Sequence, residues 1–406
     1  MTPESTSAKY DRYRRAVHGE SLPLALVDLD AVDRNVEQLL APVRGTGKSL
    51  RLASKSLRCV ALIRYVMERC GQSARGVMAY AVPEAMALID AGFDDILVAY
   101  PSVQASDCRL IAAANARGST VAIVVDSDEH LEPLAVAARA HGTVIPVVIE
   151  ADLSYRRWSG RVHLGVRRSP LHTAHEVVEF ARRVATQVGL RVHGVMGYEA
   201  QIAGLGDANP FSPWMNTPRR LVREISRSYV ERTRREIADG LRREGIAITV
   251  FNGGGSGSLN WCATEDALTE VSAGSGFVDS HLFDYYRHLR LEPALCFALQ
   301  VVRRPRAGMV TCHGGGYVAS GEPGQDRLPL PYLPEGLQLT RMEAVGEVQT
   351  PLSVPAGLKL FPGDPVFFRH AKAGELAERF SEYLFVRGDR IERRELTYRG
   401  AGKCFV

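Results

Sequence analysis

Short apolar runs alternate with longer helix-like segments from about Pro23 to Phe277. Segments with 3.6-residue periodicity separate several of these runs, among them Val82–Ile89, His175–Val188 and Pro218–Arg243. Strands separated by helices form βαβ units around a parallel sheet, and about eight such units in about 250 residues are typical of a (β/α)8 barrel. The pattern therefore predicts a TIM-type (β/α)8 barrel. The predicted strands are Leu24–Asp28, Ser49–Ala53, Gly76–Ala79, Asp95–Ala99, Val121–Val125, Val144–Glu150, Val192–Met196 and Ile248–Phe251.

The pattern changes after about Asp284. Short apolar runs there are separated by Gly, Pro and charged residues, and Gly388-Asp389 is a hairpin-type turn signal. This pattern predicts a C-terminal all-β domain over residues 284–406, which follows a barrel over residues 21–283. Residues 1–20 form an N-terminal extension that either stands apart or joins the β-domain. The predicted β-domain strands are Ala298–Val302, Met309–Thr311, Leu337–Leu339, Pro365–Phe368 and Tyr383–Val386.

Composition narrows the class of protein. The chain has 406 residues, 46% of them hydrophobic, and a formal net charge of +4, with its arginines scattered as isolated pairs. Such a distribution is not typical of a nucleic-acid-binding surface. The first twenty residues carry no apolar segment of a secretory signal, and no run reaches the ~18 apolar residues of a membrane span. Seven cysteines without regular spacing do not indicate a disulfide framework. We therefore expect a cytoplasmic protein with neither nucleic acid nor membrane as a partner.

Lys55 is the first candidate for chemistry. It follows the predicted strand Ser49–Ala53, and the carboxyl ends of barrel strands face the active site. A lysine partly withdrawn from water has a lowered pKa and forms a Schiff base with an aldehyde cofactor. The alternative is a solvated lysine in a loop, which is the usual place for this residue type.

Two glycine-rich turns near the end of the predicted barrel are candidates for a phosphate site. Asn252–Ser258 reads Asn-Gly-Gly-Gly-Ser-Gly-Ser after a strand, and Ala273–Gly276 reads Ala-Gly-Ser-Gly. Glycines let backbone N–H groups turn toward an anion, and late strands of such barrels commonly carry a phosphate site. Many glycine turns, however, only reverse the chain direction.

Taken together, these motifs resemble the fold-type III pyridoxal-phosphate enzymes, whose barrel is alanine racemase-like, and within them the D-threonine aldolase/D-serine dehydratase-like branch. The resemblance spans nearly the whole chain. Five elements stand in the branch's order: Pro23–Asp30, Arg51–Ser56 with the lysine, Gly197–Ala200, Asn252–Ser258 and Glu270–Asp279.

The resemblance implies roles for individual residues. Lys55 would bind pyridoxal 5'-phosphate covalently, and Tyr198 would lie beside the cofactor. His163 stands where related barrels often carry an arginine near the cofactor. The residues implied for the phosphate are Gly254, Gly255, Ser256, Gly274, Ser275 and Gly276.

The chain departs from the branch at several positions. Ala53 replaces a histidine of the lysine motif, and Gly276 replaces a tyrosine of the second phosphate turn. Zinc-dependent members carry His-x-Cys or His-x-Asp in the β-domain, whereas this chain has His370 followed two residues later by Lys372. Lysine is not a zinc ligand.

Three interpretations of this pair stay open. In the first interpretation, the Lys372 ammonium replaces the charge of the divalent metal beside a β-oxygen of the substrate, and His370 is the second catalytic candidate. Alternatively, His370 still binds metal together with Glu375 or another carboxylate. The third interpretation makes His370 structural and Lys372 a surface residue.

The resemblance implies a lyase acting on a D-configured β-hydroxy amino acid, by retro-aldol cleavage or by dehydration and deamination. An amino-acid racemase is the first alternative, with Tyr317 and Tyr332 as open candidates for its second base. A non-catalytic pyridoxal-phosphate-binding regulatory protein is the second. The implied partners are a small amino-acid substrate and a second copy of the chain in a homodimer. The substrate's side chain is not specified by these motifs.

Overall fold

A computed structural model describes residues 4–158 and 160–405. The chain divides into two compact units. One, here called the barrel unit, comprises Glu37–Lys55, Met67–Gly274 and the chain end from Phe405. The other, here called the sheet unit, comprises the residues up to Val36, Ser56–Val66 and Ser275–Cys404.

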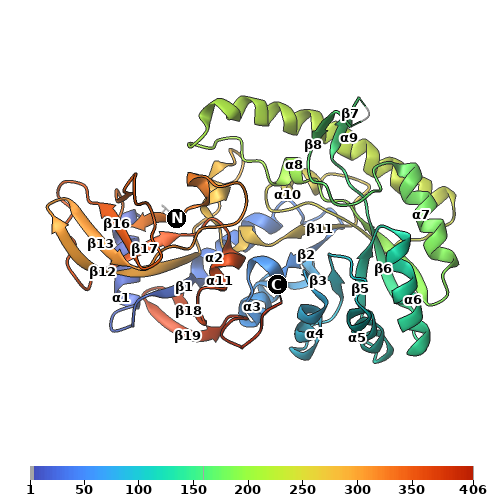
Figure 1. The fold of residues 1–406 in the computed structure, drawn as a ribbon, viewed down its shortest axis with the longest axis horizontal. Coiled ribbons are helices and arrows are strands. Elements are labelled where there is room, and N and C mark those ends of the chain that lie inside the picture. The colour runs from blue at the N-terminus through green and yellow to red at the C-terminus, as the bar shows by residue number, and fades with distance from the viewer. Residues whose placement is uncertain (1–3, 159, 406) are drawn as a thin grey trace. The chain divides into compact units, whose positions relative to one another are not determined.

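A closed barrel of parallel strands forms the centre of the barrel unit (Figure 1). Its strands follow one another around the barrel in the order β10, β11, β2, β3, β4, β5, β6 and β9, and every neighbouring pair is parallel. The predicted TIM-type barrel is confirmed. The bounds are β2 (Ser49–Ala53), β3 (Ala74–Ala79), β4 (Ile96–Val98), β5 (Val121–Val125), β6 (Ile145–Glu150), β9 (Leu190–Met196), β10 (Val250–Gly253) and β11 (Glu270–Ala273).

One predicted barrel strand was wrong. Leu24–Asp28 is β1, which lies in the sheet unit between an antiparallel β12 and a parallel β18. All five of its residues are buried, and a fully buried run reads alike in a barrel and in a central sheet strand. The eighth barrel strand is instead β11, which alternates the polar Glu270 and Ser272 with Val271 and Ala273 and therefore does not form an apolar run.

Helices follow most of the barrel strands and cover the outside of the barrel (Figure 1). Helix α7 begins at a capping box, in which Thr173 and Glu176 satisfy each other's backbone N–H groups. The helices of the chain are α1 (Thr6–Ala16), α2 (Leu29–Leu40), α3 (Val60–Cys70), α4 (Val82–Asp90), α5 (Ala105–Ala116), α6 (Leu131–Ala140), α7 (Ala174–Thr186), α8 (Ala200–Ala203), α9 (Asn216–Arg243), α10 (Leu259–Cys262) and α11 (Ala373–Ala377). A small antiparallel hairpin of β7 (Tyr155–Arg157) and β8 (Val162–Leu164) follows β6.

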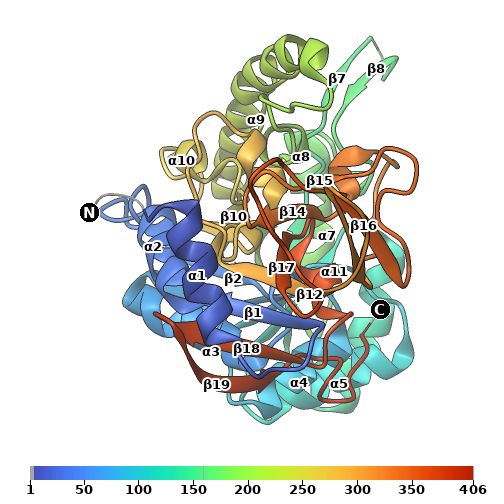
Figure 2. The same ribbon diagram turned by 90° about the vertical axis from the view of Figure 1, so that its left-hand side faces the viewer.

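The sheet unit is built on a nine-stranded, mostly antiparallel sheet, of which Figure 2 shows β12, β1 and β18. The predicted sheet-rich C-terminal region is confirmed, and the Gly388-Asp389 turn joins β18 to β19 as an antiparallel hairpin. Helix α1 packs on this sheet through Tyr10 and Tyr13, whose rings meet Phe367 edge-on. Besides β1, the strands are β12 (Leu295–Arg306), β13 (Met309–His313), β14 (Leu330–Leu333), β15 (Gln338–Leu339), β16 (Gln349–Ser353), β17 (Pro365–Arg369), β18 (Glu382–Arg387) and β19 (Arg390–Leu396).

Within the described residues, no helix combines the length and the apolar character that crossing a membrane requires.

Candidate active site

Lys55 lies just past the carboxyl end of β2, in a single turn of 3-10 helix over Ser54–Ser56. The Ser54 hydroxyl donates a hydrogen bond of 2.9 Å to the carbonyl of Met78 on the neighbouring strand β3, which fixes the start of this turn. The Lys55 side chain is exposed. Lys55 therefore stands, accessible, at the end of the barrel where enzymes of this architecture place their chemistry.

The two glycine turns follow neighbouring strands, β10 and β11. The Gly274 N–H points to the Ser256 hydroxyl at 3.5 Å, so that the two turns meet within the barrel unit. Gly254 adopts a φ of +86°, a conformation that favours glycine. Ser275 and Gly276 belong to the sheet unit, where the hydroxyls of Ser275 and Ser56 lie 2.7 Å apart.

Tyr198 follows β9 and lies against the first glycine turn. A Cβ atom at Gly255 would lie 3.2 Å from Cε2 of the tyrosine ring, so glycine lets the turn approach the ring. The Arg168 guanidinium lies 5.4 Å from the centroid of the same ring. Burial raises the pKa of the Tyr198 phenol to about 12, so it stays protonated at neutral pH.

These residues share one arc of the barrel mouth. Strands β9, β10, β11 and β2 are consecutive neighbours in the closed barrel, and each contributes one element directly after its carboxyl end. In order around the barrel these elements are Tyr198, the turn at Gly254–Ser256, Gly274 and Lys55. Residues far apart in sequence are thus brought to one side of one opening, in an arrangement that suits a ligand with an anionic end and an amine-reactive end.

His163 lies on β8, in the hairpin that follows β6. Its Nε2 donates a hydrogen bond of 2.8 Å to the Val166 carbonyl, and its buried Nδ1 has no hydrogen-bond partner within the described chain. The ring is therefore oriented by the segment that follows β8. A direct role toward the cofactor stays a prediction.

Sequence reasoning missed a buried polar network inside the barrel. Arg51 on β2 donates to Glu270 at 2.6 Å and to Asp95 at 3.0 Å. Asn252 donates to the same Glu270 carboxylate at 2.7 Å and to the Ser272 hydroxyl at 2.8 Å. These side chains lie below the two glycine turns on the strands that carry them. In the sequence these residues appear as polar positions that alternate with apolar ones along a strand. The same pattern is typical of a strand with one exposed face.

Glu150 is a second residue that sequence reasoning missed. It ends β6 in register with Met196 of β9, two residues after Val148. Val148 and Met196 belong to the same core cluster, and residues two apart on a strand share a face, so Glu150 faces the barrel interior below the mouth. Burial raises the pKa of its carboxyl to about 7, with Asp126 and Asp152 adding to the shift and Arg168 opposing it.

The sheet unit holds the other two candidates, His370 and Lys372, directly after β17. His370 is 2% exposed, and neither ring nitrogen has a hydrogen-bond partner among the described residues. Burial lowers the pKa of this imidazole to about 3, helped by the nearby His281 and Arg369. The Lys372 ammonium donates to the Ser320 hydroxyl at 2.7 Å and lies 3.5 Å from a Glu375 carboxylate oxygen.

The contacts of Glu375 bear on the interpretation in which His370 binds a metal. Among the described residues, no group of three or more His, Cys, Asp or Glu side chains could hold an ion. Glu375, the carboxylate considered as a partner for His370, accepts the N–H of Ser320 at 2.7 Å and pairs with Lys372. Glu375 is thus engaged elsewhere, and metal binding by His370 with another carboxylate stays a prediction.

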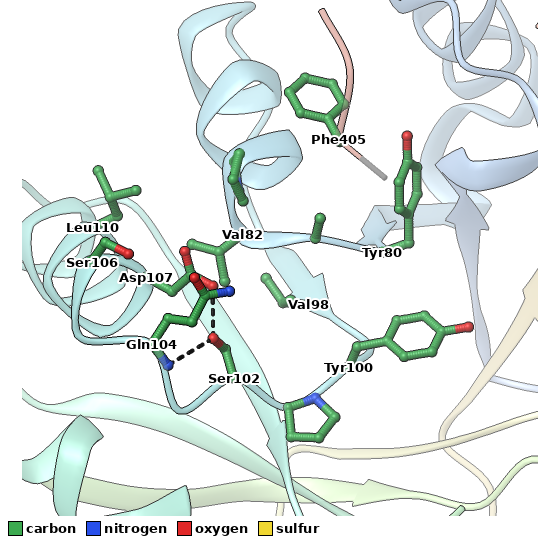
Figure 3. Close-up of a pocket in the computed structure, with 13 residues that line it drawn as sticks. Tyr80, Val82, Val98, Tyr100, Ser102, Gln104, Ser106, Asp107, Leu110 and Phe405 are labelled. Atoms are coloured by element: carbon green, nitrogen blue, oxygen red, sulfur yellow. Dashed lines mark hydrogen bonds between the residues drawn. The ribbon is translucent and has the colours of Figure 1, made fainter. Parts of the chain in front are cut away.

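A hollow of about 510 Å³ opens at the carboxyl ends of β3 and β4 (Figure 3). Tyr80 and Tyr100, the residues that follow these strands, extend to the same side of it, and the chain end contributes Phe405. The Ser102 hydroxyl donates to the Asp107 carboxylate at 2.6 Å in its wall. Within the described chain, none of the predicted site residues lines this hollow.

A lysine and two glycine turns at the mouth of a parallel barrel are typical of barrel proteins that bind a phosphorylated cofactor. The chain belongs to the family described as alanine racemase, N-terminal domain, which it matches over residues 27–278. This is a family of fold-type III pyridoxal-phosphate enzymes.

The chain is also similar to individual proteins. It is 27% identical over 266 residues to 3-hydroxy-D-aspartate aldolase of Paracoccus denitrificans (strain Pd 1222), covering 65% of this chain and 62% of that aldolase. The match therefore spans less than two thirds of that relative's own length. It is 25% identical over 362 residues to D-threonine aldolase of Arthrobacter sp, covering 86% and 87% of the two chains. The crystal structure of D-threonine aldolase from Filomicrobium marinum has the same fold, with a TM-score of 0.78 at 20% identity over 94% of this chain and 95% of that one.

The arc at the barrel mouth fits pyridoxal phosphate. Lys55 offers a primary amine at the carboxyl end of β2. The turns at Ser256 and Gly274 meet through the Ser256 hydroxyl and the Gly274 N–H, and bring polar groups to the carboxyl ends of β10 and β11. Tyr198 offers an aromatic ring that lies against the first turn, at the end of the arc opposite Lys55. Amine, anion-binding turns and aromatic surface are the groups that an aldehyde, a phosphate and a pyridine ring require.

Proposed function

We propose that this protein is a pyridoxal-phosphate-dependent lyase acting on a D-configured β-hydroxy amino acid. The observation that carries the proposal is the arc of four neighbouring strand ends that groups Lys55, Tyr198 and the two glycine turns. Support for the lyase reaction comes from the similarity to proteins named as aldolases of 3-hydroxy-D-aspartate and D-threonine.

Each group of the arc takes one part of the cofactor. Lys55 would bind its aldehyde, the turns at Gly254–Ser256 and Gly274–Gly276 would bind its phosphate, and Tyr198 would pack beside its ring, with His163 at the edge. When bound, pyridoxal phosphate supplies an electron sink for negative charge that develops at Cα of an amino acid.

The chain's own residues would then transfer protons and stabilise the charge that develops. Lys55 Nζ would be the natural base for a proton at Cα or at the β-oxygen. His370, the second catalytic candidate, is neutral at neutral pH because burial lowers its pKa to about 3; its buried ring nitrogens would reach the β-oxygen only once uncovered. Positive charge toward that oxygen would come from Lys372, whose ammonium is held by Ser320 and Glu375.

Which bond breaks decides between the two lyase reactions. Removing the β-hydroxyl proton and breaking the Cα–Cβ bond gives an aldehyde and a smaller amino acid. Removing the Cα proton and expelling the β-hydroxyl releases water and leaves an imine, which takes up water to give ammonia and a keto acid. Both need a group that controls the β-oxygen, the role proposed for Lys372.

The first experiment is an absorption spectrum of the purified protein with pyridoxal phosphate, before and after borohydride, followed by a panel of D- and L-amino acids. We expect a cofactor band, cofactor fixed to the Lys55 peptide in mass spectrometry, and an aldehyde or keto acid released from D-β-hydroxy substrates. Lys55→Ala should lose the fixed cofactor and essentially all turnover, whereas Lys48→Ala should keep both. Stereoinversion without cleavage would make the protein a racemase, and a cofactor band with no reaction would favour a binding protein.

Lys372→Ala tests the proposed role of the sheet unit. We expect kcat to fall by about 100-fold or more, as when a charge-stabilising donor is removed from an enzyme, with cofactor binding unchanged. Lys359→Ala, at an exposed lysine of the same unit, is the control. Near-wild-type turnover of Lys372→Ala would make Lys372 a surface residue and end this part of the proposal.

A homodimer and a cytoplasmic location remain proposals, supported only by resemblance and by the sequence. Sedimentation equilibrium of the purified protein, at twice or once the 44.5 kDa chain mass, decides the first.

A further inference from the structure

A buried ion cluster lies directly under the first glycine turn. Arg234, in the middle of α9, is fully buried and pairs with two carboxylates, those of Glu199 and Glu265. Withdrawing such charges from water costs several kcal/mol per ion unless the partners are well placed. A cluster of this kind in the wall of the barrel therefore needs an explanation beyond packing.

The cluster connects two of the strand ends that form the arc. One guanidinium nitrogen of Arg234 donates both to Glu199 and, at 2.6 Å, to the Gly197 carbonyl at the end of β9. Its other terminal nitrogen donates to Glu265. Arg234 thus holds the backbone next to Tyr198 from below.

Glu199 carries the connection into the glycine turn. Its carboxylate accepts the Gly254 N–H at 3.1 Å and the hydroxyl of Ser258. Ser258 in turn accepts the Gly255 N–H at 3.1 Å. The first N–H groups of the turn are therefore committed to the protein, and the turn is held at its start and at its end by one carboxylate.

Space around the guanidinium is limited. A Cβ atom at Gly253 would lie 2.5 Å from an Arg234 guanidinium nitrogen. The glycine at this position lets the charged group approach the backbone, which explains a feature of the Gly-Gly-Gly run that an anion site alone does not require. With the turn held from below, Ser256 is left on the side where it meets the Gly274 N–H.

We propose that Glu199 and Arg234 are positioning residues for the cofactor's phosphate: they lock the first glycine turn to the end of β9, so that Ser256 and its neighbours meet the anion in one fixed arrangement. This inference rests on the assignment of the turn as the phosphate site in the proposed function. Glu199 and Arg234 would thus raise the affinity for phosphate through the turn that they hold, without a contact of their own to substrate or cofactor.

The test compares two ligands that differ only in the phosphate. Equilibrium constants for pyridoxal phosphate and for pyridoxal are measured by absorbance titration of wild type, Glu199→Gln and Arg234→Lys. We expect the affinity for pyridoxal phosphate to fall by about tenfold or more, the effect of losing one hydrogen bond to a charged group, and the affinity for pyridoxal to change by less than about threefold. The ³¹P resonance of the bound cofactor should shift in Glu199→Gln.

Arg223→Lys is the matched control. Arg223 is also a buried arginine of α9, paired with Asp207 at 3.2 Å instead of with the residues of the turn. It should leave the ratio of the two affinities unchanged. If Arg234→Lys does not fold, Glu199→Gln and Ser258→Ala decide the question, because both remove a contact of the turn and leave the guanidinium in place.

Equal losses for the two ligands, or no loss for either, would overturn the inference and leave the lyase proposal standing. If the wild-type protein binds neither ligand, the cofactor assignment itself is refuted. Because the readout is binding, a failure to find a substrate does not affect the result.

Discussion

The two halves of the barrel interior differ in the polarity of their side chains. Along β3, β4, β5 and β6 the interior is apolar, formed by Met78, Leu97, Ala99, Ala122, Val124 and Val148, and joined by Met196 of β9. Along β10, β11 and β2 it is a hydrogen-bonded network of Arg51, Asn252, Glu270 and Ser272. The polar half is the one whose strand ends carry Lys55 and the glycine turns.

The difference indicates what each half must do. An apolar interior fills volume and tolerates small shifts, because hydrophobic contacts are non-directional. A buried network of charges and amides fixes distances between strands, at the cost of desolvation. We infer that the polar half holds three neighbouring strand ends in register for the cofactor, while the apolar half closes the barrel.

The largest effect is expected from Arg51→Met. This change removes the guanidinium from Glu270, which is 1% exposed, and leaves a buried carboxylate with Asn252 alone. We expect the free energy of unfolding to fall by about 3–5 kcal/mol, measured by denaturant titration. Arg75→Met is the control, because Arg75 also pairs with Asp95, at 3.1 Å, but its side chain is 53% exposed; it should cost less than about 1 kcal/mol. Similar losses for both variants would refute the distinction between buried and exposed pairs.

Leu97→Ala probes the apolar half and should have the next largest effect. The cavity it leaves should cost about 2–3 kcal/mol, at the lower end of the usual range, because the neighbouring Met78 is flexible enough to fill part of it. The decisive measurement is the ratio of affinities for pyridoxal phosphate and pyridoxal, which should stay at the wild-type value. A change in that ratio as large as that of Glu199→Gln would mean that the two halves do not differ in function.

The comparison also shows how far the sequence could be read. Lys55 and the turn at Asn252–Ser258 were predicted because glycines and a lysine after apolar runs are local signals. Glu199 and Arg234 were not, since they are 35 residues apart and Arg234 lies in a helix rich in arginines, most of which are at least partly exposed. Strand β11 was missed for a related reason: its inward-facing residues are polar because they belong to the network. Only the closed barrel brings these residues into contact.

Glu150→Gln tests the border between the halves and should have the smallest effect on stability. Glu150 faces the interior at the end of β6, beside the apolar cluster, and burial raises the pKa of its carboxyl from an ordinary value of 4.5 to about 7. A carboxyl with a raised pKa in the folded protein favours folding fully below pH 4.5, and this contribution is lost as the pH rises through about 7. Wild type should therefore lose stability between these two values at this site.

Glutamine keeps the shape of the protonated carboxyl and cannot ionise. The variant should be less stable than wild type near pH 4.5, because the amide replaces the acid imperfectly. It should gain on wild type as the pH rises, by about 1.4 kcal/mol per unit of pKa shift, and exceed it at pH 8 by about 1 kcal/mol. Thermal unfolding of both proteins across this range measures the difference. Parallel profiles would show that Glu150 ionises freely in the folded barrel, and the polar half would then extend to β6.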